Sequence, residues 1–208
     1  MGRHTGPVEK LSRREGVELF LKGERALNGK SALERRGDAP PGQHGSNRRR
    51  KVSIYQTQLR AKQTAKRYYG VRERQFRNYV KKANSAHGVT GEELLRLLER
   101  RLDNVVYRLG FAGSRAQARQ LVRHGHFLVN GRRVNIPSYG VRPNDVVTMK
   151  AGSPAEPVVR DATDLTASVA PWLQADHEGL TGKVLKWPER AEIDAPVQES
   201  LIVELYSK

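Results

Sequence analysis

Apolar side chains recur at helical spacing in three parts of the chain. The region 90–109 places five of them on one face: Leu94, Leu98, Leu102, Val105 and Leu109. This spacing predicts a single long helix that ends at Gly110. A second stripe predicts a helix over 72–84: Phe76, Tyr79, Val80 and Ala83. A third helix is expected over 53–69, with apolar residues on one side, Val52, Tyr55 and Leu59, and Gly70 as its stop.

The region 114–136 predicts a short helix followed by a hairpin. Ser114 and Gln117 have the spacing of a capping box, and Gly125 is the expected left-handed stop of a helix over 115–124. Inward-facing positions of this helix are Ala118, Leu121 and Val122. The Asn130–Gly131 pair is typical of a tight hairpin turn, here between a strand over 126–129 and a return strand over 133–136.

The remaining elements are short. We expect a strand over 146–150, a loop or linker over 152–157, and strand-like segments over 183–187 and 201–206. The predicted fold class is therefore α+β. It has a basic, mostly helical N-terminal domain with an extended basic arm over 1–90, and a helix-helix-hairpin module over 91–150 whose two helices pack on a small antiparallel sheet. An acidic C-terminal extension with short strands follows over 151–208.

The charge of the chain is both large and unevenly distributed. The net charge is +16, from 38 Lys+Arg against 22 Asp+Glu. Residues 1–90 carry a net charge of +15 and residues 91–150 a net +6, whereas residues 151–208 carry a net −5. Because so much like charge opposes compaction unless a polyanion offsets it, we expect a nucleic acid to bind the first two-thirds of the chain. The acidic tail is expected to face solvent or a protein.

The loop over 37–51 ends in four cations and contains Pro40, Pro41, Gly42 and Gly45. This composition prevents regular structure. Two interpretations are compatible: a solvated tail, and an arm that becomes ordered only on RNA.

The residues indicate no catalytic or metal chemistry. The chain contains no cysteine, which removes disulfides, thiolate ligands and thiol nucleophiles. Walker, nucleophile-elbow and dinucleotide-binding patterns are absent from the sequence. His124 and His126 are too isolated from carboxylates to favour a metal pair, and a role toward phosphate or in packing beside Gly125 is the favoured interpretation. We expect Trp172 and Trp187 to be core anchors.

The tripeptide over 101–103, Arg-Leu-Asp, is similar to a catalytic tripeptide of pseudouridine synthases. It lies within the predicted long helix and lacks the Thr and Gly that follow it in those enzymes. We therefore expect a surface ion pair on a helix. The N-terminal sequence MGRHTGPVEK has no apolar core of a signal peptide, no run approaches the length of a membrane span, and no membrane partner is expected.

The region 100–150, which includes RLDNVVYRLGFAGSRAQARQLVRHGHFLVNGRRVN, closely resembles the RNA-binding module named after ribosomal protein S4. Other proteins share that module, among them pseudouridine synthases, a heat-shock RNA-binding protein and some tyrosyl-tRNA synthetases. Here the resemblance extends to MGRHTGPV, LKGER, ERR, PPGQHG, QLRAKQ, YYGVRERQFRNY and LIVELYSK, which are similar to the bacterial uS4 family over nearly the whole chain.

The resemblance implies a non-enzymatic constituent of the small ribosomal subunit that binds a helix junction in the 5′ domain of 16S rRNA and nucleates assembly. It also implies small-subunit proteins three and five as neighbours, a place near the channel through which mRNA enters, a role in translational fidelity, possible contact with mRNA, and a cytoplasmic location in the ribosome. Many relatives carry four zinc-binding cysteines, and the matching positions here are Glu9, Ser12, Ala26 and Ser31. This departure predicts a zinc-free variant without cofactors.

Arginines are expected to contact phosphates and sugars, and tyrosines to stack on splayed bases or ribose, although Tyr55 is also a candidate core residue. The candidate RNA-binding residues are Arg48, Arg49, Arg50, Lys51, Tyr55, Gln58, Arg60, Lys62, Arg67, Tyr68, Tyr69, Arg72, Arg74, Arg77, Ser114, Arg115, Gln117, Arg119, Arg123, His124, His126, Asn130, Arg132, Arg133, Asn135 and Tyr139.

Three alternatives remain at this point. A free RNA chaperone or stress factor could use the same module, and it would sediment partly free of small subunits. An RNA-modifying enzyme would need a catalytic domain, for which the tail is too short. A DNA-binding helix-turn-helix protein is disfavoured by the hairpin and the broad basic face, and competition with duplex DNA would identify it.

Overall fold

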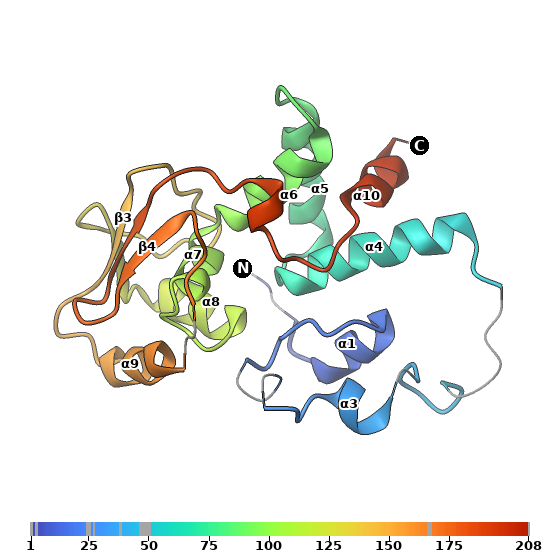
Figure 1. The fold of residues 1–208 in the computed structure, drawn as a ribbon, viewed down its shortest axis with the longest axis horizontal. Coiled ribbons are helices and arrows are strands. Elements are labelled where there is room, and N and C mark those ends of the chain that lie inside the picture. The colour runs from blue at the N-terminus through green and yellow to red at the C-terminus, as the bar shows by residue number, and fades with distance from the viewer. Residues whose placement is uncertain are drawn as a thin grey trace. The chain divides into compact units, whose positions relative to one another are not determined.

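The computed structural model divides the chain into two compact units, each described by itself (Figure 1). It describes residues 2, 4–23, 26, 28–37, 39–45, 51–165 and 168–207. Unit one comprises Met1–Leu94 with Asp194–Lys208, and unit two comprises Leu95–Ile193. The acidic region over 151–208 is therefore divided between the two units, whereas the charge pattern predicted a separate extension.

Unit one is helical throughout its regular elements. Its helices are α1 (Glu9–Glu15), α3 (Ala32–Arg36), α4 (Ile54–Tyr68), α5 (Glu73–Asn84) and α10 (Glu199–Tyr206), and α6 (Thr90–Glu99) begins in it. Ser53 caps α4 by accepting the Gln56 N–H at 3.2 Å, and Gly70 follows the helix with a φ of 62°. The helix predicted over 53–69 is therefore confirmed. It could be predicted because its cap and its stop are local signals.

The buried side of α4 differs from the one that the sequence predicted. Val52 is 56% exposed and Tyr55 is 60% exposed, so neither lies in the core. The helix instead buries a mostly polar set: Gln58, Lys62, Thr64, Ala65 and Tyr68. Polar side chains occupy this face because α1, α5 and α10 present carboxylates to it, as the contacts of Glu15, Glu73 and Glu204 show below.

Helix α5 matches its predicted stripe. Phe76, Val80 and Ala83 are buried, and Tyr79 is half-buried. Arg74, Arg77 and Lys81 of this helix are exposed. The last helix, α10, corrects the strand-like interpretation of 201–206. Its run of Leu, Ile and Val has high strand propensity, but Ile202 is buried and Tyr206 and Glu204 bond to side chains of α5 and α4, so tertiary contacts override the local preference.

Unit two contains a break where one long helix was predicted. Helix α6 ends at Glu99, and α7 (Leu102–Arg108) begins after an extended Arg101 with φ −66° and ψ 136°. The first N–H groups of α7 bond to a loop: Leu102 N–H donates to the Tyr139 carbonyl at 2.8 Å and Asp103 N–H to the Pro137 carbonyl at 3.1 Å. The break thus satisfies a helix terminus through residues almost forty positions away.

Five antiparallel strands form one sheet in the order β2-β1-β3-β5-β4. They are β1 (Phe127–Val129), β2 (Arg132–Arg133), β3 (Val146–Met149), β4 (Leu173–Asp176) and β5 (Thr181–Val184). The return strand of the hairpin is therefore shorter than the predicted 133–136. The strand expected over 183–187 lies earlier, and Val147 of β3 pairs with Gly182 of β5, so part of the acidic region completes the sheet.

Helices α7 and α8 (Arg115–His124) pack on this sheet around a single hydrophobic core, as the sequence predicted for the module (Figure 1). Leu109, Leu121 and Phe127 are core members, and Trp172 is almost completely buried among them, which confirms its expected role. A further helix that the sequence did not predict, α9 (Glu156–Asp164), adds Val159 to the core. No helix within the described ranges is long and apolar enough to span a membrane.

Candidate nucleic-acid interface

The first turn of α8 is organised by two side chains. Ser114 Oγ accepts the Gln117 N–H at 3.3 Å, and Gln117 Oε1 accepts the Gly113 N–H at 2.8 Å. Both predicted cap residues are therefore used, although the glutamine reaches Gly113 rather than Ser114. These contacts fix the start of the helix that carries three of the candidate arginines.

The three arginines of α8 have different surroundings. Arg115 donates from Nε to Asn104 Oδ1 at 2.8 Å, and its guanidinium carbon lies 4.4 Å from the centre of the Tyr107 ring. Arg119 is 3.8 Å from the Asp103 carboxylate. Arg123 is exposed. The first two are held in place by α7, which reduces the entropy that they lose when they meet a ligand.

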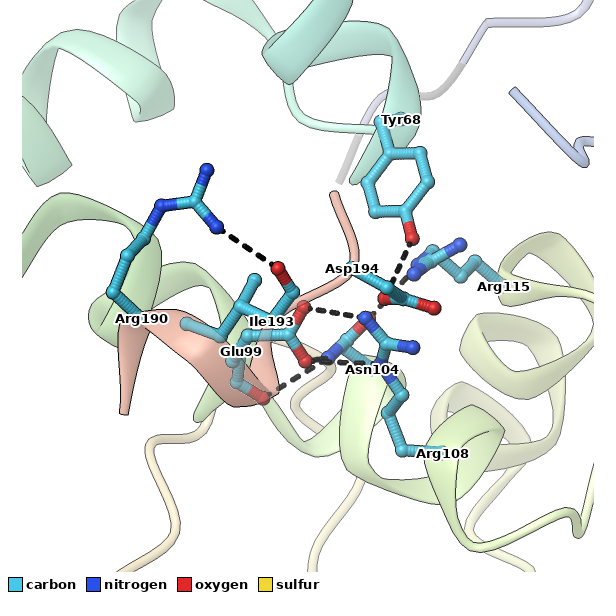
Figure 2. Close-up of polar contacts among 8 residues, drawn as sticks. All are labelled: Tyr68, Glu99, Asn104, Arg108, Arg115, Arg190, Ile193 and Asp194. Atoms are coloured by element: carbon cyan, nitrogen blue, oxygen red, sulfur yellow. Dashed lines mark hydrogen bonds and ion pairs between the residues drawn. The ribbon is translucent and has the colours of Figure 1, made fainter. Parts of the chain in front are cut away.

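A buried polar network supports Arg115. Figure 2 shows the side chains of Glu99, Asn104 and Arg108 pointing toward one another. Arg108 binds the fully buried Glu99 carboxylate with both Nε (3.1 Å) and Nη2 (2.9 Å), and Asn104 Nδ2 donates to Glu99 Oε2 at 2.6 Å. Since Asn104 then accepts from Arg115, the end of α6, helix α7 and the start of α8 share one hydrogen-bonded chain.

The Arg101–Asp103 pair also differs from its prediction. Arg101 is 1% exposed, and its Nη2 lies 2.6 Å from Asp103 Oδ2. The pair is therefore buried at the start of α7, whereas the sequence predicted an ion pair on the surface of a helix. Burial makes it a structural element of the junction between α6 and α7, because a buried charge must keep its partner.

The hairpin after α8 has the predicted tight turn. Asn130 and Gly131 both have positive φ values, 50° and 75°, as a type I′ turn requires. The Asn130 amide donates to Asp145 Oδ1 and accepts the Val146 N–H, both at 2.9 Å. The Asn130 side chain thus stabilises the turn, and its expected contact with RNA stays a prediction. Arg132 and Arg133 are exposed beside it.

Arg133 connects the hairpin to the end of α8. Its Nη2 donates to the His124 carbonyl at 3.4 Å. The guanidinium also covers Gly125, where an added Cβ would lie 2.3 Å from Arg133 Nε. His124, His126 and Arg133 are therefore gathered in one place. Further candidates of this unit, Asn135 and Tyr139, are exposed on the loop after the hairpin.

The candidates of unit one fall into two groups. The exposed ones are Lys51, Tyr55, Arg72, Arg74 and Arg77, and the buried ones are Gln58, Lys62, Tyr68 and Tyr69. Arg48, Arg49 and Arg50 lie outside the described residues.

The buried group has internal partners. Gln58 donates to Glu204 at 2.9 Å, and Lys62 pairs with Glu73 at 3.0 Å. The Tyr68 and Tyr69 rings, each 3% exposed, meet edge to face at 5.0 Å. These four side chains therefore stabilise unit one through internal contacts, and their expected contacts with RNA stay a prediction.

Arg60 and Arg67 share the buried carboxylate of Glu15. They lie between the two groups, because each is half-buried and keeps part of its side chain at the surface. This ion cluster joins α1 to α4. Lys150, which was not among the predicted RNA-binding residues, also belongs to the cationic surface. It is exposed directly after β3. Its backbone N–H donates to the His126 carbonyl at 2.8 Å. The strand predicted over 146–150 was the one sequence signal that could have placed Lys150 beside the hairpin.

The positions that match the zinc ligands of many relatives do not fit that metal. Glu9 Oε2 accepts the Ala32 N–H at 2.9 Å, and Ser31 Oγ accepts the Glu34 N–H at 3.2 Å. Ser12 and Ala26 are buried and offer no thiolate. The described residues contain no group of three metal-binding side chains. The Ala32–Glu9 hydrogen bond therefore joins α1 to α3, and the Ser31 hydroxyl caps α3, where a metal would need thiolate donors.

Comparison with known proteins identifies the family of the chain. Residues 3–99 match the family described as "Ribosomal protein S4/S9 N-terminal domain", and residues 100–147 match the "S4 domain". The second match contains α7, α8 and the hairpin. These matches define the class: a ribosomal protein built on an S4 RNA-binding domain.

The similarity to curated proteins covers 100% of both chains. The sequence identity is 56% over 210 residues to small ribosomal subunit protein uS4 of Natranaerobius thermophilus and 56% over 209 residues to protein uS4A of Symbiobacterium thermophilum. It is 54% over 209 residues to protein uS4 of Desulfitobacterium hafniense. The chain belongs to the uS4 family of small ribosomal subunit proteins. This confirms the resemblance seen in the sequence, and the family is structural rather than enzymatic.

Proposed function

We propose that the protein is a structural constituent of the small ribosomal subunit that binds a helix junction in the 5′ domain of 16S rRNA and nucleates subunit assembly. The observation that carries the proposal is the cationic surface of α8 and the hairpin, in the segment that matches the S4 domain. RNA helices are recognised mainly by shape, phosphates and 2′-hydroxyls. A rigid body with arginines on several elements suits closely spaced phosphates at a junction.

The proposal extends to the surroundings in the ribosome. Small-subunit proteins three and five are the proposed protein neighbours, near the channel through which mRNA enters in the cytoplasmic ribosome, with a role in translational fidelity. The support is the similarity over the full chain to small-subunit proteins. The acidic side chains of α9, such as Asp161 and Asp164, are exposed. This negative surface repels RNA and favours contact with a basic protein.

Binding to the 5′-domain RNA, measured over a salt titration beside an intact duplex of equal length, tests the proposal. We expect tighter binding to the junction and a steep salt dependence, because each neutralised phosphate adds roughly −0.7 to −0.9 to the log–log slope. Equal affinity for both RNAs would contradict it and favour the alternative, a free RNA chaperone or stress factor. Sedimentation separates the two further, since a subunit constituent migrates stoichiometrically with small subunits.

A further inference from the structure

The end of α8 and the adjacent strands gather four cationic or ionisable side chains at one point. His124 closes the last turn of α8, and His126 follows Gly125, whose φ is 76°. Arg133 reaches the point from β2, and Lys150 from the end of β3. The two imidazole rings lie 6.0 Å apart, nearly perpendicular. The Ser153 hydroxyl also lies here, with its Oγ 2.8 Å from His126 Nδ1.

This cluster contains no compensating carboxylate. Within the part of the chain that the structure describes, neither Arg133 nor Lys150 forms a salt bridge. The pKa of His126 lies below its usual range. Burial is the largest cause, followed by the charges of His124, Arg133 and Lys150. The nearest acidic residue along the chain, Glu156 of α9, pairs with Arg160 instead. Like charges this close favour the binding of an anion.

The helix terminus does not oppose an anion here. The C-terminal end of a helix carries a partial negative charge on its last carbonyls. Arg133 Nη2 donates to the His124 carbonyl, and the Gly125 N–H donates to those of Leu121 and Val122. These bonds offset the dipole and leave the remaining guanidinium donors of Arg133, the Lys150 ammonium and the imidazoles for a ligand.

We propose that His124, His126, Arg133, Lys150 and Ser153 form a proton-linked phosphate site, which binds one phosphate of the RNA backbone and holds His126 in its imidazolium form. The proposal rests on the proposed function for the identity of its ligand. A phosphate supplies the negative charge that the cluster lacks, and it accepts hydrogen bonds from each of these groups. RNA affinity therefore rises as the pH falls through the range in which His126 takes up its proton.

The free, full-length protein provides the first test, with inorganic phosphate as the probe. Histidine NMR signals are followed over pH in chloride and in phosphate of equal ionic strength, and assigned with His→Gln variants. We expect phosphate to raise the pKa of His126. The NMR signals of the exposed His87, which lies in unit one, serve as the control for general effects of the anion. An identical His126 titration in both anions would overturn the site.

A second variant keeps the test informative should His126→Gln not fold. Lys150→Gln removes an exposed side chain from the cluster. Because Lys150 lowers the pKa of His126, this variant should raise it in chloride and reduce the further rise caused by phosphate. An unchanged response to phosphate in Lys150→Gln would exclude Lys150 from the site.

Binding of the 5′-domain RNA over pH provides the second test. If RNA raises the pKa of His126 by about one, affinity rises roughly tenfold across the titration. We expect His126→Gln to lose this gain and the matched control His87→Gln to keep it. A wild-type protein that binds the junction with the same pH dependence as His126→Gln overturns the site but not the proposed function. Failure to prefer the junction contradicts the proposed function, and the phosphate titration still decides the site.

Discussion

At the scale of single residues, Glu99 has an unusual position for a carboxylate. Its side chain is fully buried, and its charge is balanced by two hydrogen bonds from Arg108 and one from Asn104. Removing one partner of such a group leaves a buried charge without compensation, which costs more than the pair contributes. The same network orients Arg115 through Asn104, so stability and the candidate surface depend on one carboxylate.

Glu99→Ala should destabilise the protein by about 3–5 kcal/mol, because Arg108 and Asn104 would lose their buried acceptor. Urea unfolding followed by circular dichroism measures the change. Glu156→Ala is the matched control, since its pair with Arg160 is exposed and should cost about 1 kcal/mol or less. Equal midpoints for the two variants would contradict the importance of the network.

Asn130 and Arg132 should separate stability from binding within one turn. Asn130→Ala loses the bonds to Asp145 and Val146 and places a side chain that disfavours positive φ at the turn, so we expect a loss of about 1–3 kcal/mol. Arg132→Ala should leave unfolding unchanged and reduce the log–log salt slope of RNA binding by about one. Unfolding curves and salt titrations of both variants test this, and the opposite assignment of effects would refute it.

At the scale of elements, two residues in the last turn of α10 make polar contacts that hold it to α4 and α5. Tyr206 Oη donates to Glu73 Oε1 at 2.9 Å, and Glu204 accepts from Gln58 at 2.9 Å. Burial, together with Glu73, raises the pKa of Tyr206, so the phenol remains a donor. Glu73 also pairs with Lys62 and Lys66. One carboxylate thus links three helices of unit one.

Tyr206→Phe should weaken the docking of α10 by about 1 kcal/mol, because it removes one hydrogen bond to a charged, partly exposed group and keeps the ring near Phe76. Hydrogen exchange of the α10 amides measures local opening. We expect faster exchange in α10 and unchanged exchange in β1 of unit two, which serves as the internal control. Unchanged protection of α10 would contradict this role.

The pH dependence of unit one follows from the same carboxylate. Burial raises the pKa of Glu73, but the hydrogen bonds from Lys62, Tyr206 and Lys66 outweigh it and place the pKa below its usual range. A lowered pKa stabilises the folded state above the unfolded value and loses this contribution as the pH falls through the folded value. Unfolding measured over acidic pH should therefore depend less on pH in Glu73→Gln than in wild type. Parallel profiles would contradict this.

At the scale of the whole molecule, charge and fold compete. Residues 1–150 carry a net charge of +21, which the −5 of residues 151–208 reduces to +16, and much of the positive charge remains at the surface after internal pairing. Self-repulsion of such a chain destabilises its compact state, and salt screens it. We expect the melting temperature of the free protein to rise with moderate salt and to rise further with 5′-domain RNA. A melting temperature insensitive to both would contradict this balance.

Part of this description follows from the sequence alone. The helices over 54–68, 73–84 and 115–124 and the Asn130–Gly131 turn were predicted, because caps, glycine stops and apolar periodicity act between neighbours in the chain. The family was recognisable for the same reason, since its motifs are contiguous. The polyanion as a partner followed from the distribution of charge, which needs no fold.

Tertiary structure decided the remainder. The break at Arg101 depends on carbonyls of Pro137 and Tyr139, and the helix over 199–206 depends on side chains of α4 and α5. The sequence also did not show which basic and aromatic candidates face outward. Lys62 is buried through its contact with Glu73, and Tyr68 contacts a residue near the other end of the chain. The gathering of His126, Arg133 and Lys150 requires a helix end and two strands in register. Local pattern specifies each element, but only long-range packing specifies which of its faces is covered.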